Sequence, residues 1–180
     1  MKNVSIRFGI IAGIIIIAYS ILVFLVMGDF SSMDAGDFKK VEMLGFLRYI
    51  ILFLTVFLSI RYFKKQNSGE GTFRQLFLAG LYTALVIAML VGLMELLYMW
   101  LNPQFISQYA ELSTRKLQES GASAERIAEH KKQLEQFSWM ASPAIMGVYY
   151  FLETAVLGAI CSAIVGLLMR RRTNPVTRQG

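Results

Sequence analysis

The stretch from Leu76 to Leu101 reads LFLAGLYTALVIAMLVGLMELLYMWL, and Glu95 is the one charged residue within it. At about 1.5 Å per helical residue, such a stretch exceeds the hydrocarbon core of a bilayer, which is about 30 Å thick. Three further apolar stretches occupy residues 8–27, 43–62 and 143–169. The sequence therefore predicts an all-α protein, an integral membrane four-helix bundle that crosses lipid four times.

The composition supports a single membrane domain over residues 1–180. Hydrophobic residues make up 56% of the chain, above the about 45–50% of soluble domains, and charged residues make up 17%, below their about 25%. A net charge of +6 would suit nucleic acid, but the basic residues gather at the ends of the apolar stretches, which excludes that partner. The single cysteine, Cys161, predicts a small buried side chain and neither a disulfide nor a thiolate metal site.

Basic residues at the span ends predict the orientation, because Lys and Arg favour the cytoplasmic side. One side carries ten of them against a single acid, Glu70, at positions Lys2, Arg7, Arg61, Lys64, Lys65, Arg74, Arg170, Arg171, Arg172 and Arg178. The connections on the other side balance basic with acidic residues. We therefore expect both termini in the cytoplasm. Residues 8–27 should be a retained span, because they are longer than a signal-peptide core and no small-x-small site follows them.

A polar segment at residues 103–140 separates the third and fourth spans. Asn102 and Pro103 should end or bend the third span. Beyond them an amphipathic stripe recurs at helical spacing, formed by Phe105, Tyr109, Leu112 and Lys116. Gly121 suits a left-handed cap and Ser123 can cap a second helix. We expect an extramembrane helical hairpin into which the two spans extend directly, serving either as a docking or sensing head or as a stable connector.

Three charged residues lie inside the predicted spans and away from their ends, namely Arg48, Glu95 and Glu153. A charge facing acyl chains costs about 2.5 kcal/mol or more, so these side chains should point inward and find partners. Depth along the helices places Arg48 and Glu95 at one level and Glu153 deeper, near the middle of the membrane. We therefore predict an Arg48–Glu95 pair, with Glu153 either completing a cluster or staying protonated. Helical phase places Ser59 and Tyr62 near the face of Arg48.

Small residues repeat every four positions on two spans, a pattern on which membrane helices approach closely. On the third span the stripe is Gly80, Ala84, Ala88 and Gly92, and on the fourth it is Gly158, Ser162 and Gly166. We interpret both stripes as helix-packing surfaces.

No catalytic, metal or cofactor motif emerges from the sequence. There is no HExxH, no GxSxG and no histidine within the spans, so we expect no enzyme activity, no cofactor and no metal. His130 is the one histidine, and we interpret it as a solvated residue and not as a ligand.

Three features of the chain occur together: Gly69-Glu70-Gly71-Thr72-Phe73 with Phe77 and Gly80, Asn102-Pro103-Gln104-Phe105 with Tyr109, and a glycine-rich final span running into Arg172. In these features the chain resembles the bacterial membrane family known as domain of unknown function 4199. The resemblance implies four spans, a short helical insert between spans three and four, and a location in the inner membrane. It implies no activity, so no functional residue is carried over.

Two hypotheses of function follow. The first is a non-enzymatic scaffold, assembly or sensing module that binds a membrane-protein partner or a second copy within the lipid bilayer. The second is a small proton- or cation-coupled transporter or channel subunit that uses the buried carboxylates Glu95 and Glu153.

Overall fold

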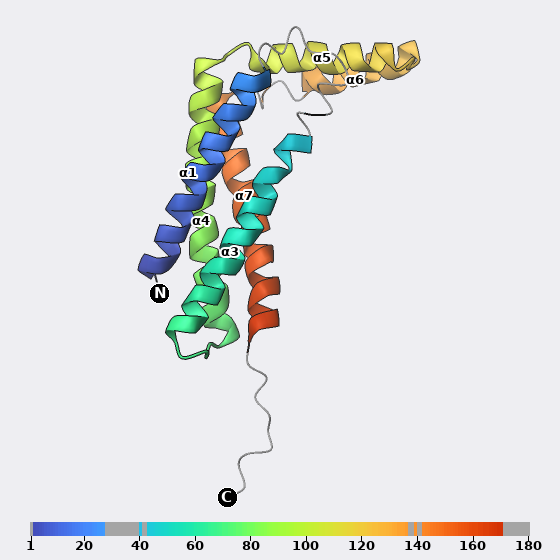
Figure 1. Cartoon of the computed structure of the whole chain (residues 1–180). Helices are drawn as coiled ribbons and strands as arrows, with labels where there is room; N and C mark the ends of the chain where they lie inside the picture. Colours follow the sequence, from blue (N-terminus) through green and yellow to red (C-terminus); the bar gives the residue numbers. More distant parts are fainter. Residues whose placement is uncertain (1, 28–39, 41–42, 137–138, 140–141, 171–180) are drawn as a thin grey trace, which may run out of the picture.

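The protein is built from helices, as the sequence predicts. The computed structural model describes residues 2–27, 40, 43–136, 139 and 142–170, and this part of the chain contains no strand. Its helices are α1 (Lys2–Met27), α3 (Leu47–Gln66), α4 (Phe73–Leu101), α5 (Phe105–Glu119), α6 (Ala124–Gln136) and α7 (Pro143–Met169) (Figure 1). Asp29, Asp34 and Asp37 in the connection after the first span lie outside the described residues, as do the C-terminal Arg171, Arg172 and Arg178.

Four helices are long and apolar enough to cross a membrane: Asn3–Leu25, Met43–Gln66, Phe73–Leu101 and Pro143–Met169. Their outer surfaces are covered by large aliphatic side chains, such as Ile11 at 60% and Leu168 at 79% exposure. Their contacts with one another also include many small residues. A water-soluble protein rarely exposes so many large aliphatic side chains, so this surface fits one that faces lipid.

The helix ends differ from the predicted span boundaries by several residues. The first helix begins at Lys2, before the apolar run at residue 8, and α3 continues to Gln66, beyond residue 62. Helix α4 begins at Phe73 because Thr72 and Gln75 form a reciprocal capping box, with the Gln75 amide donating to Thr72 Oγ1 and the Thr72 amide donating to Gln75 Oε1. Hydropathy marks the lipid-facing part of a helix, and polar caps set its true ends.

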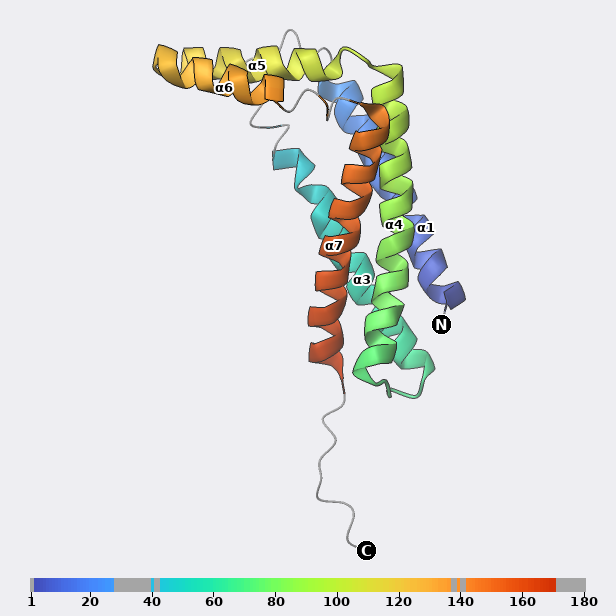
Figure 2. The same ribbon diagram turned by 180° about the vertical axis from the view of Figure 1, so that it is seen from behind.

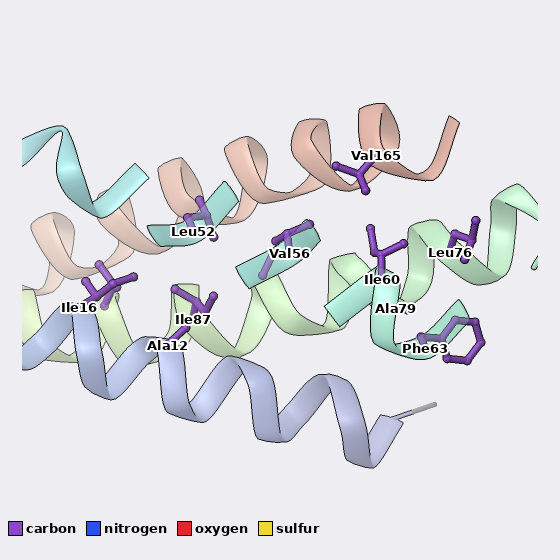
Figure 3. Packing of buried hydrophobic residues seen from close by; sticks show 12 residues of the cluster. Ala12, Ile16, Leu52, Val56, Ile60, Phe63, Leu76, Ala79, Ile87 and Val165 are labelled. Carbon is purple, nitrogen blue, oxygen red and sulfur yellow. The ribbon is translucent and has the colours of Figure 1, made fainter. Parts of the chain in front are cut away.

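Helix α4 lies at the centre of the four long helices and contacts α1, α3 and α7. Its largest interface is with α7, and the two helices lie side by side in both views (Figures 1 and 2). Apolar side chains from all four helices meet around it, as Figure 3 shows for Ile16, Val56, Ile87 and Val165. The core cluster contains no residue of α5 or α6.

Helices α5 and α6 pack on each other and point sideways from the long helices (Figures 1 and 2). The expectation that the spans extend directly into this hairpin is therefore wrong for α4. Its helix ends at Leu101, where Asn102 caps it by donating from Nδ2 to the Tyr98 carbonyl at 2.9 Å, and Pro103 cannot continue it. The chain then turns before α5 begins at Phe105.

The turn between α5 and α6 has the predicted chemistry. Gly121 has φ +74, the left-handed conformation that glycine adopts without strain, and no atom lies within 4 Å of the place where its Cβ would be. Ser123 accepts a hydrogen bond from the Arg126 amide at 3.3 Å, which confirms its capping role. The predicted hairpin reaches residue 140, but residues 137–138 and 140 lie outside the described part of the chain.

The two ends of the long helices have different neighbours. At one end, which we call the hairpin end, α4 passes into α5 (Figure 1). At the other, the terminal end, α1 begins, α3 turns into α4 and α7 finishes. The start of α1 and the end of α7 therefore lie on the same side, as an even number of crossings requires.

Candidate functional site

The structure brings the three predicted intramembrane charges together near the hairpin end. Arg48 lies in the first turn of α3, Glu95 on α4 and Glu153 on α7. The guanidinium contacts both acids, with Nη2 at 3.1 Å from Glu153 Oε2 and Nη1 at 4.0 Å from Glu95 Oε1. One cation thus links three helices that are distant in sequence.

Two tyrosines complete this cluster. The Tyr49 hydroxyl donates to Glu153 Oε1 at 2.6 Å and accepts a hydrogen bond from Arg48 Nη2. The Arg48 guanidinium carbon lies 4.7 Å from the centre of the Tyr49 ring and 4.8 Å from that of Tyr150. Cation–π contact of this kind stabilises a desolvated guanidinium by about 0.5–2 kcal/mol. We call Arg48, Tyr49, Glu95, Tyr150 and Glu153 the charge cluster.

The charge cluster holds two carboxyl groups and one guanidinium. Glu153 receives two short hydrogen bonds, whereas Glu95 is 8% exposed and has only the longer contact with Arg48 among the described residues. Arg48 Nε is buried without a hydrogen-bond partner there. If both carboxyl groups were ionised, the cluster would carry one uncompensated negative charge. Chemically it can therefore hold one proton or one small cation in addition to the arginine.

The predicted Arg48–Glu95 pair is present, and Glu153 completes the cluster, which was one of its two predicted alternatives. The expectation that Glu153 lies deeper and without a cation is wrong, because Arg48–Glu153 is the shorter of the two ion pairs. The depth estimate counted residues from the outer end of each predicted span as if all these ends lay at one level. Helix tilt and unequal starting levels remove the expected offset, so Glu153 meets Arg48 despite lying ten residues after Pro143.

The predicted polar face of α3 is partly present. Ser59 is fully buried and its hydroxyl lies 2.7 Å from that of Thr83 on α4. The Thr83 hydroxyl also lies 3.3 Å from the carbonyl of Ser5 on α1. Tyr62 in contrast is 45% exposed and packs on Phe8, with ring centres 5.7 Å apart. Helical phase identified Ser59, but Thr83 and Ser5 carry no sequence signal that separates them from other isolated hydroxyls.

The small-residue stripes lie in the interfaces of α4. Gly80, Ala84, Ala88, Gly92, Gly158, Ser162 and Gly166 are all buried. A Cβ on Gly92 would lie 2.7 Å from the Gly147 carbonyl oxygen and 2.9 Å from Phe151 Cβ, and one on Gly80 would lie 2.6 Å from Ser162 Oγ. Gly147 was missed because it falls outside the four-residue repeat on α7, although it opposes Gly92 directly.

His130 was predicted to be a solvated residue, and the structure differs from this prediction. It is half-buried on α6, and its Nε2 lies 3.0 Å from the Ser113 hydroxyl of α5, a contact that fastens the hairpin. No cluster of His, Cys, Asp or Glu with metal-binding geometry occurs among the residues described.

Comparison with known proteins agrees with this architecture and adds no activity. The searches of curated proteins and of solved structures returned no match. A family model described as a protein of unknown function (DUF4199) matches residues 7–171, which covers α1 from Arg7 onward, the other three long helices, the hairpin and the charge cluster. The chain therefore belongs to the DUF4199 family.

Proposed function

We propose that this protein is a non-enzymatic membrane module that docks an integral membrane partner through its α5–α6 hairpin, as a scaffold or assembly factor. The observation that carries the proposal is the direction of the hairpin, which points sideways from the long helices and contributes nothing to their core (Figure 2). A connector between α4 and α7 would need only a short turn, since these helices already pack side by side. Helices α5 and α6 therefore extend sideways beyond the long helices, over the position that an adjacent membrane protein would occupy.

The charge cluster supports a structural role for the membrane part. Arg48 and Tyr49 satisfy Glu153, and two aromatic rings flank the guanidinium. Such a network fixes the register of α3, α4 and α7. A rigid set of helices would hold the hairpin at a constant height and direction, which docking requires.

Photocross-linking in intact cells tests the docking proposal. A photoreactive residue is placed at the exposed positions Glu119 or Gln133 of the hairpin, with Asn67 in the α3–α4 turn as the matched control. We expect a discrete protein adduct from both hairpin positions and a different pattern from Asn67. Adducts with lipid alone, or the same adducts from all three positions, would contradict the proposal.

A second variant tests whether the hairpin itself carries the partner. Replacing residues 105–136 with a short Gly/Ser linker should leave the long helices folded, because their core excludes the hairpin. The thermal unfolding midpoint should change little, while co-purification of the cross-linked partner is lost. A partner retained by the folded deletion variant would place the docking surface elsewhere.

A second candidate function is proton- or cation-coupled transport, and the charge count favours it. Two carboxyl groups share one guanidinium, and Glu95 is the less well satisfied of them. Flux of protons, Na⁺ or K⁺ into proteoliposomes should then depend on Glu95, and Glu95→Gln should abolish it. Gln133→Glu, an exposed change in the hairpin, serves as the control. Absence of any flux from the native protein would remove this candidate.

The proposed location is the inner membrane of a bacterial cell, with the terminal end in the cytoplasm. The basic residues in the last turns of α3 (Arg61, Lys64 and Lys65) and in the first turn of α4 (Arg74) support this orientation. In a Cys161→Ala background, a cysteine at Asn67 should react with a membrane-impermeant maleimide only after the cells are opened. A cysteine at Glu119 should react in intact cells. The reverse pattern would invert the orientation.

A further inference from the structure

A basic recess opens at the terminal end between α1 and α3. Its volume is about 530 Å³, and its walls come from Phe8 on α1, from Leu58, Arg61, Tyr62, Lys64 and Lys65 on α3, and from Gly69 in the following turn. Three cationic side chains therefore line the recess together with two apolar side chains and the phenol of Tyr62. This combination of charge and apolar surface distinguishes the recess from an ordinary solvated helix end.

The arrangement of the helices creates the recess. Helix α1 begins short of the turn that joins α3 to α4, so the end of α3 extends beyond the start of α1 (Figures 1 and 2). Phe8 closes the inner side by packing on Tyr62. On the outer side Gly69 has φ +80, and no atom of the described residues lies within 4 Å of its Cβ position.

The cations of the recess are available to a ligand. No carboxylate is among its lining residues, and the part of the chain that the structure describes gives Arg61 and Lys65 no acidic partner. Lys64 also lines the recess, but its ammonium donates to the Met169 carbonyl at 2.7 Å and caps α7. Anionic oxygens would therefore meet the Arg61 guanidinium and the Lys65 ammonium at a membrane boundary.

We infer that this recess binds the phosphate headgroup of an anionic glycerophospholipid. The phosphate lies between Arg61 and Lys65, and an acyl chain runs along Phe8 and the 47% exposed Leu58 toward the membrane interior. Basic pockets between membrane helices on the cytoplasmic side are the usual place for such headgroups. Free inorganic phosphate has the same charged oxygens but lacks the acyl chain that the apolar wall would contact.

Native mass spectrometry of the full chain, released from detergent with defined lipid, tests the inference. Phosphatidylglycerol and phosphatidylcholine of equal chain length are compared at equal concentration. We expect bound phosphatidylglycerol in clear excess. In the double variant Arg61→Gln/Lys65→Gln, its affinity should fall about 30-fold, from the ordinary contribution of each basic residue to binding an anionic surface. Lys64 is left intact because it caps α7.

Two controls make the result decisive. Arg74→Gln removes an exposed cation of the same end that does not line the recess, and it should lower the affinity less than threefold. The single variant Lys65→Gln, at an exposed position, provides a mild change should the double variant fold poorly. Equal losses from Arg74→Gln and Arg61→Gln/Lys65→Gln would overturn the inference in favour of general surface charge. Equal binding of the two lipids, or displacement of phosphatidylglycerol by millimolar inorganic phosphate, would overturn it as well.

Discussion

The charge cluster predicts that Arg48 is coupled more strongly to Glu153 than to Glu95. The single variants are Arg48→Met, Glu153→Gln and Glu95→Gln. Two double variants combine Arg48→Met with Glu153→Gln and with Glu95→Gln. At an effective dielectric constant of about 20, the attraction across 3.1 Å is about 5 kcal/mol and that across 4.0 Å is about 4 kcal/mol. The shorter contact is also a charge-assisted hydrogen bond, which adds about 1.5–3 kcal/mol.

Desolvation offsets most of both attractions, so the difference between them is the useful quantity. We expect a coupling free energy of about 3 kcal/mol for Arg48 with Glu153 and about 1 kcal/mol for Arg48 with Glu95. Arg48→Met alone should destabilise the protein by about 3 kcal/mol, because it leaves two carboxyl groups without their cation. The variant Glu95→Gln should partly relieve that loss.

The assay is equilibrium unfolding in mixed micelles with increasing dodecyl sulfate, followed by the fluorescence of Trp100 and Trp139. Each double-mutant cycle gives one coupling free energy. Glu119→Gln on the exposed side of α5 is the matched control, and its coupling to Arg48→Met should be zero within error. A coupling to Glu95 equal to or larger than that to Glu153 would refute the assignment of the short ion pair.

Three further predictions use the same unfolding assay. Gly92→Leu should lower the free energy of unfolding by about 3 kcal/mol or more, because even a Cβ would lie 2.7 Å from the opposing backbone oxygen of Gly147. Gly45→Leu is the control and should be neutral, since nothing lies within 4 Å of its Cβ position. Equal effects of the two changes would argue against close packing at Gly92. Thr83→Val should cost about 0.6–1 kcal/mol through the lost hydroxyl contact with Ser59, and no change would show that this bond contributes nothing. Thr72→Ala should lower stability by about 1 kcal/mol through loss of the capping box, and unaltered unfolding would count against that cap.

Much of the fold follows from patterns that a single sequence carries. Long apolar runs and the four-residue spacing from Gly80 to Gly92 depend on local chemistry, and both the helices and the buried stripe lie where these patterns indicate. The caps at Gly121 and Ser123 were equally local.

The remaining features depend on how helices are placed relative to one another. The short Arg48–Glu153 pair requires the tilt and level of α7 relative to α3, which residue counting cannot provide. The contact of Gly92 with Gly147, and of Ser113 with His130, each join helices whose relative rotation is set only on packing. The sideways path of α5 likewise follows from the geometry of the turn at Asn102 and Pro103, and the sequence indicated only that a break occurs there.

The central position of α4 sets an order of assembly during synthesis. Spans are delivered to the membrane from the N-terminus, so α1 and α3 arrive before the helix that both of them contact. The glycines of α4 that receive α7 then stay uncovered while the hairpin is translated, because α7 emerges last and forms the largest of the interfaces. A chain that stops before Pro143 would expose this glycine-containing face of α4 to other newly made helices. Quality-control proteases of the membrane should therefore degrade it sooner than the finished protein.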